Sequence, residues 1–336
     1  MTSGSRGIYI LGNDRVFDDA LALVHSLRRH SPSWPILLVP YNDEYRRLAS
    51  RLKSDFGIDV FADPDLFAAL EAYSLSITGR VCPAYRKFAF WFGPFDQFVY
   101  FDTDVVVFQD QIDVFSLLDD HDIVFCGDGR VMGIREVFTE RVLDRQLFSS
   151  SEIDDLFNTG FFASRKDSLS RDQLFALLAE AAEVRDIFVP YLQDQPVLNY
   201  VALKAFRRRA NLRLLSPAIP GDAWAGLSTL RVDGDRVVDS EAMPIRNLHW
   251  AGFHRIPERP YVRVWLSYRY PGRWRAPQRL AIRVGWLVQK VARRTLCTHL
   301  PDWYKPAFQV KRVRRIWAQR IAEPLRRIWT AKDRAA

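Results

Sequence analysis

The sequence predicts an α/β fold with a sheet of the nucleotide-binding type, followed by a basic, helical C-terminal extension. Three observations indicate this. Short apolar strands alternate with helical patterns over the first half of the chain, two aspartates interrupt a buried strand near residue 102, and positive charge gathers after residue 272. With 336 residues, 48% of them hydrophobic, the chain is long enough to bury a large core and carry an appendage.

Apolar runs and helical spacing place the elements in order. Strands are expected at residues 7–11, 35–40, 59–61, around Asp102 within 97–108, and at 123–126, 157–164 and 245–248. Helices are expected at residues 17–27, with Asp14 as the cap, and at 43–56, 83–92, 114–118 and 172–184. Residues 130–156 are polar and mixed, which is typical of an excursion that covers a substrate.

Asp102 and Asp104 stand out because apolar residues surround them. A strand interior does not tolerate unpaired charge, and Mn²⁺ or Mg²⁺ suits two hard oxygen donors. Ligands of such sheets bind beyond the carboxyl ends of the strands, where both residues fall if their strand begins near Gln97. The alternative is that the two aspartates only begin a solvent-exposed turn.

A second group follows the last expected strand. His249 is followed by Gly252 and Arg255, a spacing that lets the imidazole bind a metal ion while the guanidinium meets a phosphate on that ion. The alternative is a structural histidine. In a third group, Asp194 is explained as a helix cap before Pro196, which leaves Gln195 unexplained.

Arg86 and Lys87 also allow two interpretations. They are either solvated helix residues or cations that neutralise a diphosphate near the metal ion.

Four segments together resemble a known family. Phe101-Asp102-Thr103-Asp104, Phe157-Asn158-Thr159-Gly160, Asp194-Gln195 and His249-x-x-Gly252-x-x-Arg255, in this order, resemble the GT-A nucleotide-sugar glycosyltransferases, and among them the retaining, glycogenin-like (family 8-like) group. The resemblance covers residues 7–258 and implies a GT-A fold, a Rossmann-like mixed sheet flanked by helices.

The resemblance implies a role for each matching residue. Asp102, Asp104 and His249 would bind Mn²⁺ or Mg²⁺ bridging the diphosphate of a nucleotide sugar, with a UDP-sugar as the expected donor. Thr103 and Gly252 belong to the same donor-binding motifs. Arg255 would stand where the family has a phosphate-binding lysine, although Ile256-Pro257 replaces the usual Pro-Trp that follows. The other implied donor contacts are Arg86, the sugar-facing Asn158, Asp194 and Gln195, and the base-binding Leu11, Gly12 and Asn13.

The expected activity is a metal-dependent hexosyltransferase reaction onto a glycan or lipid-linked acceptor. A metal ion and a cation stabilise the charge that develops on the leaving diphosphate. Gln195 would be a poor nucleophile, which favours retention by same-face substitution without a covalent intermediate.

Two other classes of protein compete with this interpretation. A haloacid dehalogenase-type phosphatase would use Asp102 as its nucleophile, but its motif belongs on the first strand, and three expected strands precede Asp102. A non-catalytic nucleotide-sugar-binding protein is the third interpretation.

The charge divides the chain into two predicted domains, a transferase domain at 1–262 and a Trp-rich amphipathic tail at 263–336. Residues 273–336 hold 17 Lys and Arg against three acidic residues, a net charge of +14, so residues 1–272 carry −6 of the total of +8. Cationic helices with tryptophan anchors are typical of segments that lie on anionic membranes. Docking of the tail on the catalytic domain is the alternative, and no nucleic-acid partner is expected.

The same sequence bears on location. No secretion signal is recognised, no window reaches 18 uncharged apolar residues, and the three cysteines lack a C-x-x-C pair. The expected location is cytoplasmic and peripheral, on the inner face of the cell membrane.

Overall fold

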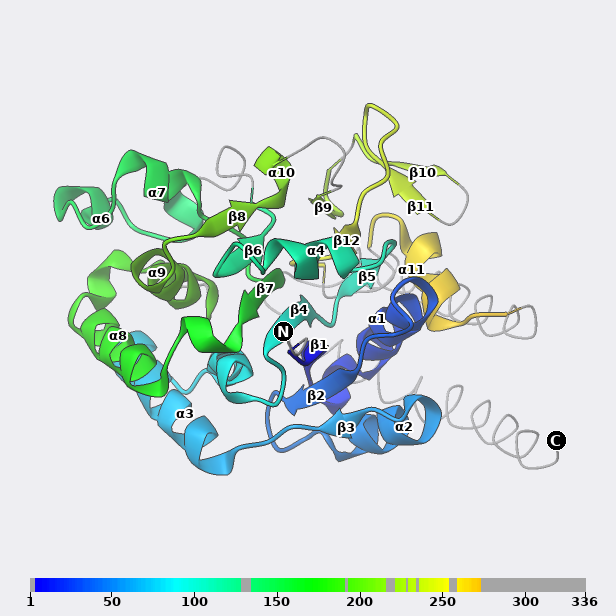
Figure 1. Ribbon diagram of the computed structural model, residues 1–336, viewed down its shortest axis with the longest axis horizontal. Coiled ribbons are helices and arrows are strands. Elements are labelled where there is room, and N and C mark those ends of the chain that lie inside the picture. The colour runs from blue at the N-terminus through cyan, green and yellow to red at the C-terminus, as the bar shows by residue number, and fades with distance from the viewer. Residues whose placement is uncertain are drawn as a thin grey trace, which may run out of the picture. The chain divides into compact units, whose positions relative to one another are not determined.

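A seven-stranded mixed sheet forms the centre of the computed structural model (Figure 1), which describes residues 4–127, 134–190, 193–215, 221–227, 229–233, 236–253 and 259–272. The strand order is β3-β2-β1-β4-β7-β6-β8. Strands β3, β2, β1 and β4 run parallel, whereas β7 is antiparallel to both β4 and β6. The strands are β1 (Arg6–Gly12), β2 (Ile36–Pro40), β3 (Asp59–Val60), β4 (Gln97–Asp102), β6 (Ile123–Phe125), β7 (Phe161–Arg165) and β8 (Arg209–Asn211).

A smaller sheet continues from the end of β4. It consists of β5 (Val105–Val107), β12 (Asn247–His249) and β9 (Asp222–Trp224), with β12 in the middle. Strand β12 is antiparallel to β5 and parallel to β9. A separate hairpin pairs β10 (Arg231–Asp233) with β11 (Arg236–Val238). Because β5 follows β4 after a two-residue turn, the smaller sheet meets the carboxyl edge of the large one.

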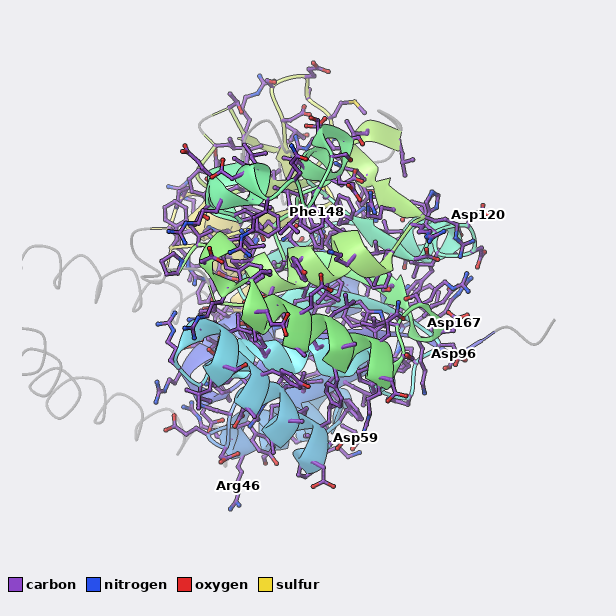
Figure 2. All side chains as sticks on the ribbon, turned by 90° about the vertical axis from the view of Figure 1, so that its left-hand side faces the viewer. Arg46, Asp59, Asp96, Asp120, Phe148 and Asp167 are labelled. Atoms are coloured by element: carbon purple, nitrogen blue, oxygen red, sulfur yellow. The ribbon has the colours of Figure 1, made fainter. Side chains whose placement is uncertain are left out.

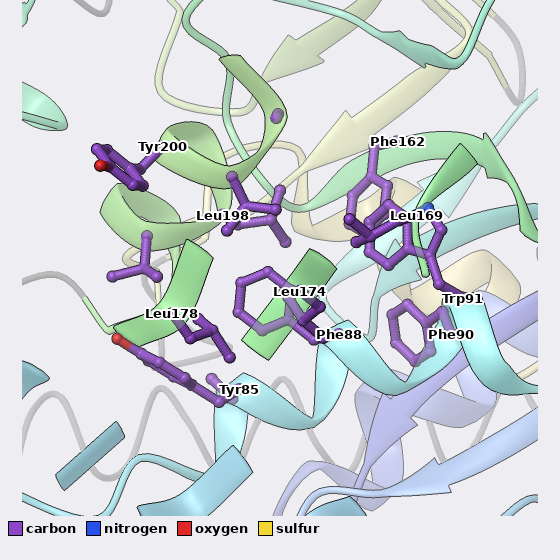
Figure 3. Packing of buried hydrophobic residues seen from close by; sticks show 14 of the residues in the cluster. Tyr85, Phe88, Phe90, Trp91, Phe162, Leu169, Leu174, Leu178, Leu198 and Tyr200 are labelled. Carbon is purple, nitrogen blue, oxygen red and sulfur yellow. The ribbon is translucent and has the colours of Figure 1, made fainter. Parts of the chain in front are cut away.

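Alternating side chains of β4 enter two separate cores, as expected of a strand buried on both faces. Phe98 and Tyr100 belong to one hydrophobic cluster, and Val99 and Phe101 belong to the other. The first cluster is covered by α3 (Pro64–Thr78), η2 (Pro83–Phe92), α8 (Arg171–Glu183) and α9 (Gln195–Ala205). Figure 3 shows aromatic residues of η2 and β7 packed with leucines of α8 and α9.

The opposite face of the sheet is covered by other helices. These are α1 (Phe17–His30), α2 (Arg46–Phe56) and α4 (Ile112–Leu117). Helix α11 (Val262–Arg269) lies beside α1, where Arg269 pairs with Asp18 and the Trp265 indole donates to Asp19. Exposed charged side chains such as Arg46, Asp96 and Asp120 extend outward in the side view of Figure 2.

Short elements complete the described chain. They are η1 (Asp14–Val16), η3 (Ile134–Glu136), α6 (Arg141–Asp144), α7 (Ser150–Asp154), η4 (Lys166–Ser168), η5 (Arg185–Ile187) and α10 (Leu212–Leu215). The described residues, which lie between 4 and 272, belong to one compact unit. The basic tail at 273–336 lies outside the described residues, so the predicted division at residue 262 and the helices of the tail stay predictions. Within the part of the chain that the structure describes, no helix combines the length and apolar character required to cross a bilayer.

The mixed α/β sheet flanked by helices is confirmed, and several predicted details differ. Asp14 does not cap α1, because its carboxylate accepts from the backbone amides of Arg47 and Leu48 at the start of α2. The helix at 83–92 is a 3-10 helix. Strand β7 begins at Phe161, since Asn158 turns the chain by accepting from the Gly160 amide at 2.9 Å.

Candidate active site

Two carboxylates lie where the large sheet meets the small one. Strand β4 ends at Asp102, and a turn through Thr103 and Asp104 leads into β5. The Asp102 amide donates to the Gly160 carbonyl at 2.8 Å, which fixes the strand end against the loop before β7. The side chains of Asp102 and Asp104 are only 30% and 25% exposed. The two residues do begin a turn, but most of each side chain is covered, unlike in a simple solvent-exposed turn.

The third member of this group comes from β12. Pairing of β12 with β5 sets His249 opposite Val105 and brings the imidazole to Asp104. His249 Nε2 lies 3.2 Å from Asp104 Oδ1 and 3.8 Å from Asp102 Oδ2. One ligand atom from each of the three residues lies within 4.8 Å of the others. Two carboxylates and one imidazole at this spacing fit a divalent cation such as Mn²⁺.

Gly160 makes room for the imidazole. A Cβ atom at this position would lie 2.2 Å from His249 Cε1, closer than nonbonded atoms approach. The interruption of the strand by Asn158 and Gly160 predicts that the backbone approaches a ligand here, and in the structure the group that lies against Gly160 is the His249 ring.

The charges of this group depend on one another. Burial lowers the pKa of His249, but the Asp104 and Asp102 carboxylates outweigh it and raise that pKa above its usual value. Burial alone would raise the pKa of Asp104, yet the neighbouring imidazole holds it below the usual range. The metal-free site therefore favours an imidazolium beside a carboxylate, and a bound cation would replace the imidazole proton.

We expect Mn²⁺ affinity to fall about tenfold for each pH unit below the raised pKa of His249, since one proton must leave before the metal binds. Titration of Mn²⁺ binding by calorimetry between acidic and neutral pH measures this slope. The folding stability of the metal-free protein depends on pH in the opposite direction. The raised pKa of His249 adds stability that is fully present below the pKa of the unfolded state and is lost as the pH rises through the pKa of the folded state. A metal affinity that does not change with pH would contradict the assignment of His249.

A buried ammonium group joins the aspartate pair to α9. Lys87 of η2 is 4% exposed, and its Nζ lies 3.1 Å from Asp102 Oδ1 and 2.8 Å from Asp194 Oδ2. It also donates to the Thr159 carbonyl at 3.1 Å. Burial alone would lower the pKa of Lys87, but the two carboxylates outweigh burial and raise this pKa above its usual value, so the ammonium stays charged. The Tyr100 hydroxyl donates to the same oxygen of Asp102.

Asp194 occupies the N-cap position of α9 without capping the helix. Its carboxylate instead accepts from the Thr159 hydroxyl at 2.9 Å and pairs with Lys87. The Thr159 amide donates to Gln195 Oε1 at 3.4 Å, and the Gln195 amide group donates to the Glu136 carbonyl. Helix capping therefore does not explain Asp194. The loop at residues 158–160 contacts Asp194 and Gln195 through Thr159 and contacts Asp102 through Gly160.

The residues predicted to bind the rest of the donor lie along the same edge of the sheet. Leu11 is in register with Asp102. Gly12 lies close to the Thr103 methyl group, and buried Asn13 donates to Asn42. Thr103 is 8% exposed.

The remaining predicted residues differ in their surroundings. Arg86 is buried, pairs with Glu71 at 2.7 Å and donates to the Pro40 carbonyl at the end of β2. The interpretation of Arg86 and Lys87 as solvated residues is therefore wrong. Gly252 adopts a left-handed conformation with φ of 82°, after Trp250 donates its amide to the Asp104 carbonyl. Arg255 lies outside the described residues.

Comparisons with known proteins agree with this architecture. Neither a protein-family model nor a curated protein matches the sequence. Among solved structures, the galactosyltransferase LgtC in complex with donor and acceptor sugar analogs matches with a TM-score of 0.55 at 16% identity, over 80% of this chain and 99% of LgtC.

Two larger proteins also match. The apo bifunctional glycosyltransferase WbbM gives a TM-score of 0.51 at 14% identity, over 84% of this chain. The apo glycosyltransferase GlyE of Streptococcus pneumoniae gives 0.51 at 17% identity, over 86%. The chain spans 52% of WbbM and 64% of GlyE. The mixed sheet, its flanking helices and these likenesses show that the chain has the GT-A fold of glycosyltransferases.

Proposed function

We propose that the protein is a metal-dependent glycosyltransferase that moves a hexose from a nucleotide sugar, most simply a UDP-sugar, to a glycan or lipid-linked acceptor. The observation that carries this proposal is the group Asp102, Asp104 and His249 at the carboxyl edge of a GT-A sheet. LgtC, which has this fold, was solved with donor and acceptor sugar analogs.

The three ligands would hold Mn²⁺ or Mg²⁺, and this ion would neutralise charge on the diphosphate leaving group. Asp102 is held for this purpose by Tyr100 and Lys87, and Asp104 by His249. Arg86 and Arg255 are assigned to the donor phosphates, as cations suited to oxyanions. Thr103 and Gly252 are assigned to the donor as members of the motifs that contain Asp102 and His249, and Leu11, Gly12 and Asn13 are assigned to the nucleoside base.

The transferred sugar is assigned to Asn158, Asp194 and Gln195. Lys87 and Thr159 already engage the Asp194 carboxylate, which weakens it as a nucleophile. We therefore favour retention in which the bond from the anomeric carbon to the diphosphate breaks, the acceptor hydroxyl oxygen bonds to that carbon on the same face, and the hydroxyl proton passes to the departing diphosphate, with no covalent enzyme intermediate. Capture of a glycosylated Asp194 from a stalled reaction would refute this.

A phosphatase reaction with Asp102 as nucleophile is not favoured. Three strands, β1, β2 and β3, precede β4 along the chain. Asp102 Oδ1 also accepts from Tyr100 and lies beside Lys87, so this oxygen is not free for attack.

The predicted tail suggests where the enzyme works. Residues 273–336 carry a net charge of +14, and cationic helices with aromatic anchors bind anionic lipid. We propose that a transferase domain at 1–262 is held at the cytoplasmic face of the membrane by the tail at 263–336. Flotation with anionic and with neutral liposomes, for the full chain and for a chain ending at residue 272, tests this assignment.

Incubation with Mn²⁺ and a panel of UDP- and GDP-sugars tests the activity. We expect slow hydrolysis of one donor, loss of that hydrolysis with EDTA, and a decrease of at least about a hundredfold for Asp104→Asn. Asp167→Asn is the matched control. The Asp167 side chain is 68% exposed and lies outside the candidate site, so this variant should behave like the wild type. Phosphate release from p-nitrophenyl phosphate would favour the phosphatase, and donor binding without turnover would favour a non-catalytic binding protein.

A further inference from the structure

Trp224 at the end of β9 is unusual in its exposure. Its side chain is large and apolar, yet the residue is 48% exposed. Among the exposed large hydrophobic residues of the described chain, it is the only aromatic one. Tryptophan is usually well buried, so an exposed ring that is also held in place indicates a contact surface.

Three contacts hold the ring in place. The indole Nε1 donates to the Ala251 carbonyl at 3.0 Å. Gly226 lies against the ring, because a Cβ atom there would be 2.4 Å from the indole Cη2. The Phe253 ring lies 5.8 Å away at an interplanar angle of 31°. The exposed indole is therefore fixed in orientation, and together with the Phe253 ring it forms a larger aromatic surface.

The position of Trp224 relates it to the candidate metal site. Strands β9 and β12 are parallel with Trp224 in register with His249, so both side chains leave the same face of the small sheet. Neighbouring strands lie about 4.8 Å apart, which puts the two backbones side by side. The Ala225 amide donates to the His249 carbonyl at 2.8 Å and fixes this register.

Strand order separates the indole from the region assigned to the donor base. Leu11 of β1 pairs with Asp102 in the large sheet, whereas Trp224 lies on the outer strand of the small sheet, beyond β5 and β12. A ligand on Trp224 would thus approach the metal site from the strands of the small sheet, whereas the nucleoside is assigned to β1 of the large sheet.

We propose that Trp224, extended by Phe253, binds the acceptor and that the acceptor presents a pyranose ring there. This inference rests on the proposed glycosyltransferase function. A pyranose has an apolar face of axial C–H groups and a hydroxyl-rich edge, so it can cover a flat indole while its hydroxyls remain solvated or hydrogen-bonded. A sugar on this platform would carry a hydroxyl toward the ion, where the transferred sugar leaves the diphosphate.

Saturation-transfer NMR with the full chain tests the platform directly. The probes are methyl β-D-galactopyranoside and methyl β-D-glucopyranoside, added one at a time, with UMP as a probe of the nucleoside site. We expect at least one glycoside to receive saturation from the wild type through its axial C–H protons. We expect Trp224→Ala to weaken that glycoside about tenfold, and Trp224→Phe, which keeps an aromatic face, about two- to threefold.

Gly226→Ala is a second variant that keeps the indole but displaces it, and it should weaken the glycoside like Trp224→Ala. Leu75→Ala, at a 50% exposed leucine of α3, is the matched control and should leave binding unchanged. UMP binding and donor hydrolysis should persist in all four variants.

The inference is wrong if neither glycoside binds the wild type, if both Trp224→Ala and Gly226→Ala bind it as the wild type does, or if Trp224→Ala weakens UMP instead. Donor hydrolysis is scored on the same samples. Its absence in the wild type would count against the proposed function alone, because glycoside binding is read without turnover.

Discussion

Gly160→Ala is expected to weaken Mn²⁺ binding by roughly 10- to 100-fold, the range typical of changes that displace a metal ligand. The added Cβ would lie 2.2 Å from His249 Cε1 and 2.9 Å from Nε2, so the imidazole must turn away from Asp104. The φ angle of Gly160 is not in the left-handed region, so alanine fits the backbone and the change acts on the ring. Calorimetric titration with Mn²⁺ measures the loss.

A control separates this effect from general loss of stability. Gly79 caps α3 at φ of 75°, and a Cβ added there would have no atom within 4 Å. Gly79→Ala should therefore cost about 1 kcal/mol of stability without changing Mn²⁺ affinity. Unchanged Mn²⁺ affinity in Gly160→Ala would mean that His249 is not a ligand.

Lys87→Met is expected to lower the free energy of unfolding by roughly 3 kcal/mol, because it leaves Asp102 and Asp194 facing each other without the cation between them. Lys87 is only 4% exposed, and water cannot replace the ammonium fully. Because a cation held by Asp102 supplies part of the missing charge, saturating Mn²⁺ should recover part of this loss. Urea denaturation with and without Mn²⁺ measures both quantities.

Lys204→Met is the matched lysine change. Its pair with Glu180 is partly exposed, at 29% and 42%, so we expect a loss below about 1 kcal/mol and no response to Mn²⁺. A Lys87→Met protein as stable as the wild type would show that the aspartates do not need this partner.

The strands are the most predictable part of the fold. Apolar runs such as 98–101 are buried on both faces, and this burial is visible directly in the sequence. Helix α3 is absent from the predicted elements, although Asp63 caps it, Pro64 begins it and Gly79 ends it. Its composition is apolar on several sides, so it lacks the one-sided periodicity that marks a surface helix.

The site is only partly predictable, because spacing along the chain indicates chemistry but not side-chain partners. Asp102, Asp104 and His249 are expected to act together, and the structure places them within contact distance. For Asp194 the cap position suggests a local role, which is wrong, since a buried ammonium 2.8 Å away attracts its carboxylate more strongly. Aromatic residues such as Tyr85 and Phe88 surround Lys87 in the sequence, and this pattern indicates that the lysine is buried.

The small sheet has a consequence for how the protein is made. Strand β12 adds the imidazole to carboxylates that lie far earlier in the chain, on β4 and the turn before β5. A nascent polypeptide emerging from the ribosome therefore exposes the two aspartates long before its histidine exists. Under the proposed function, a prematurely terminated product would be inert toward activated sugars, and the cell's donor supply would be safe from wasteful cleavage by fragments.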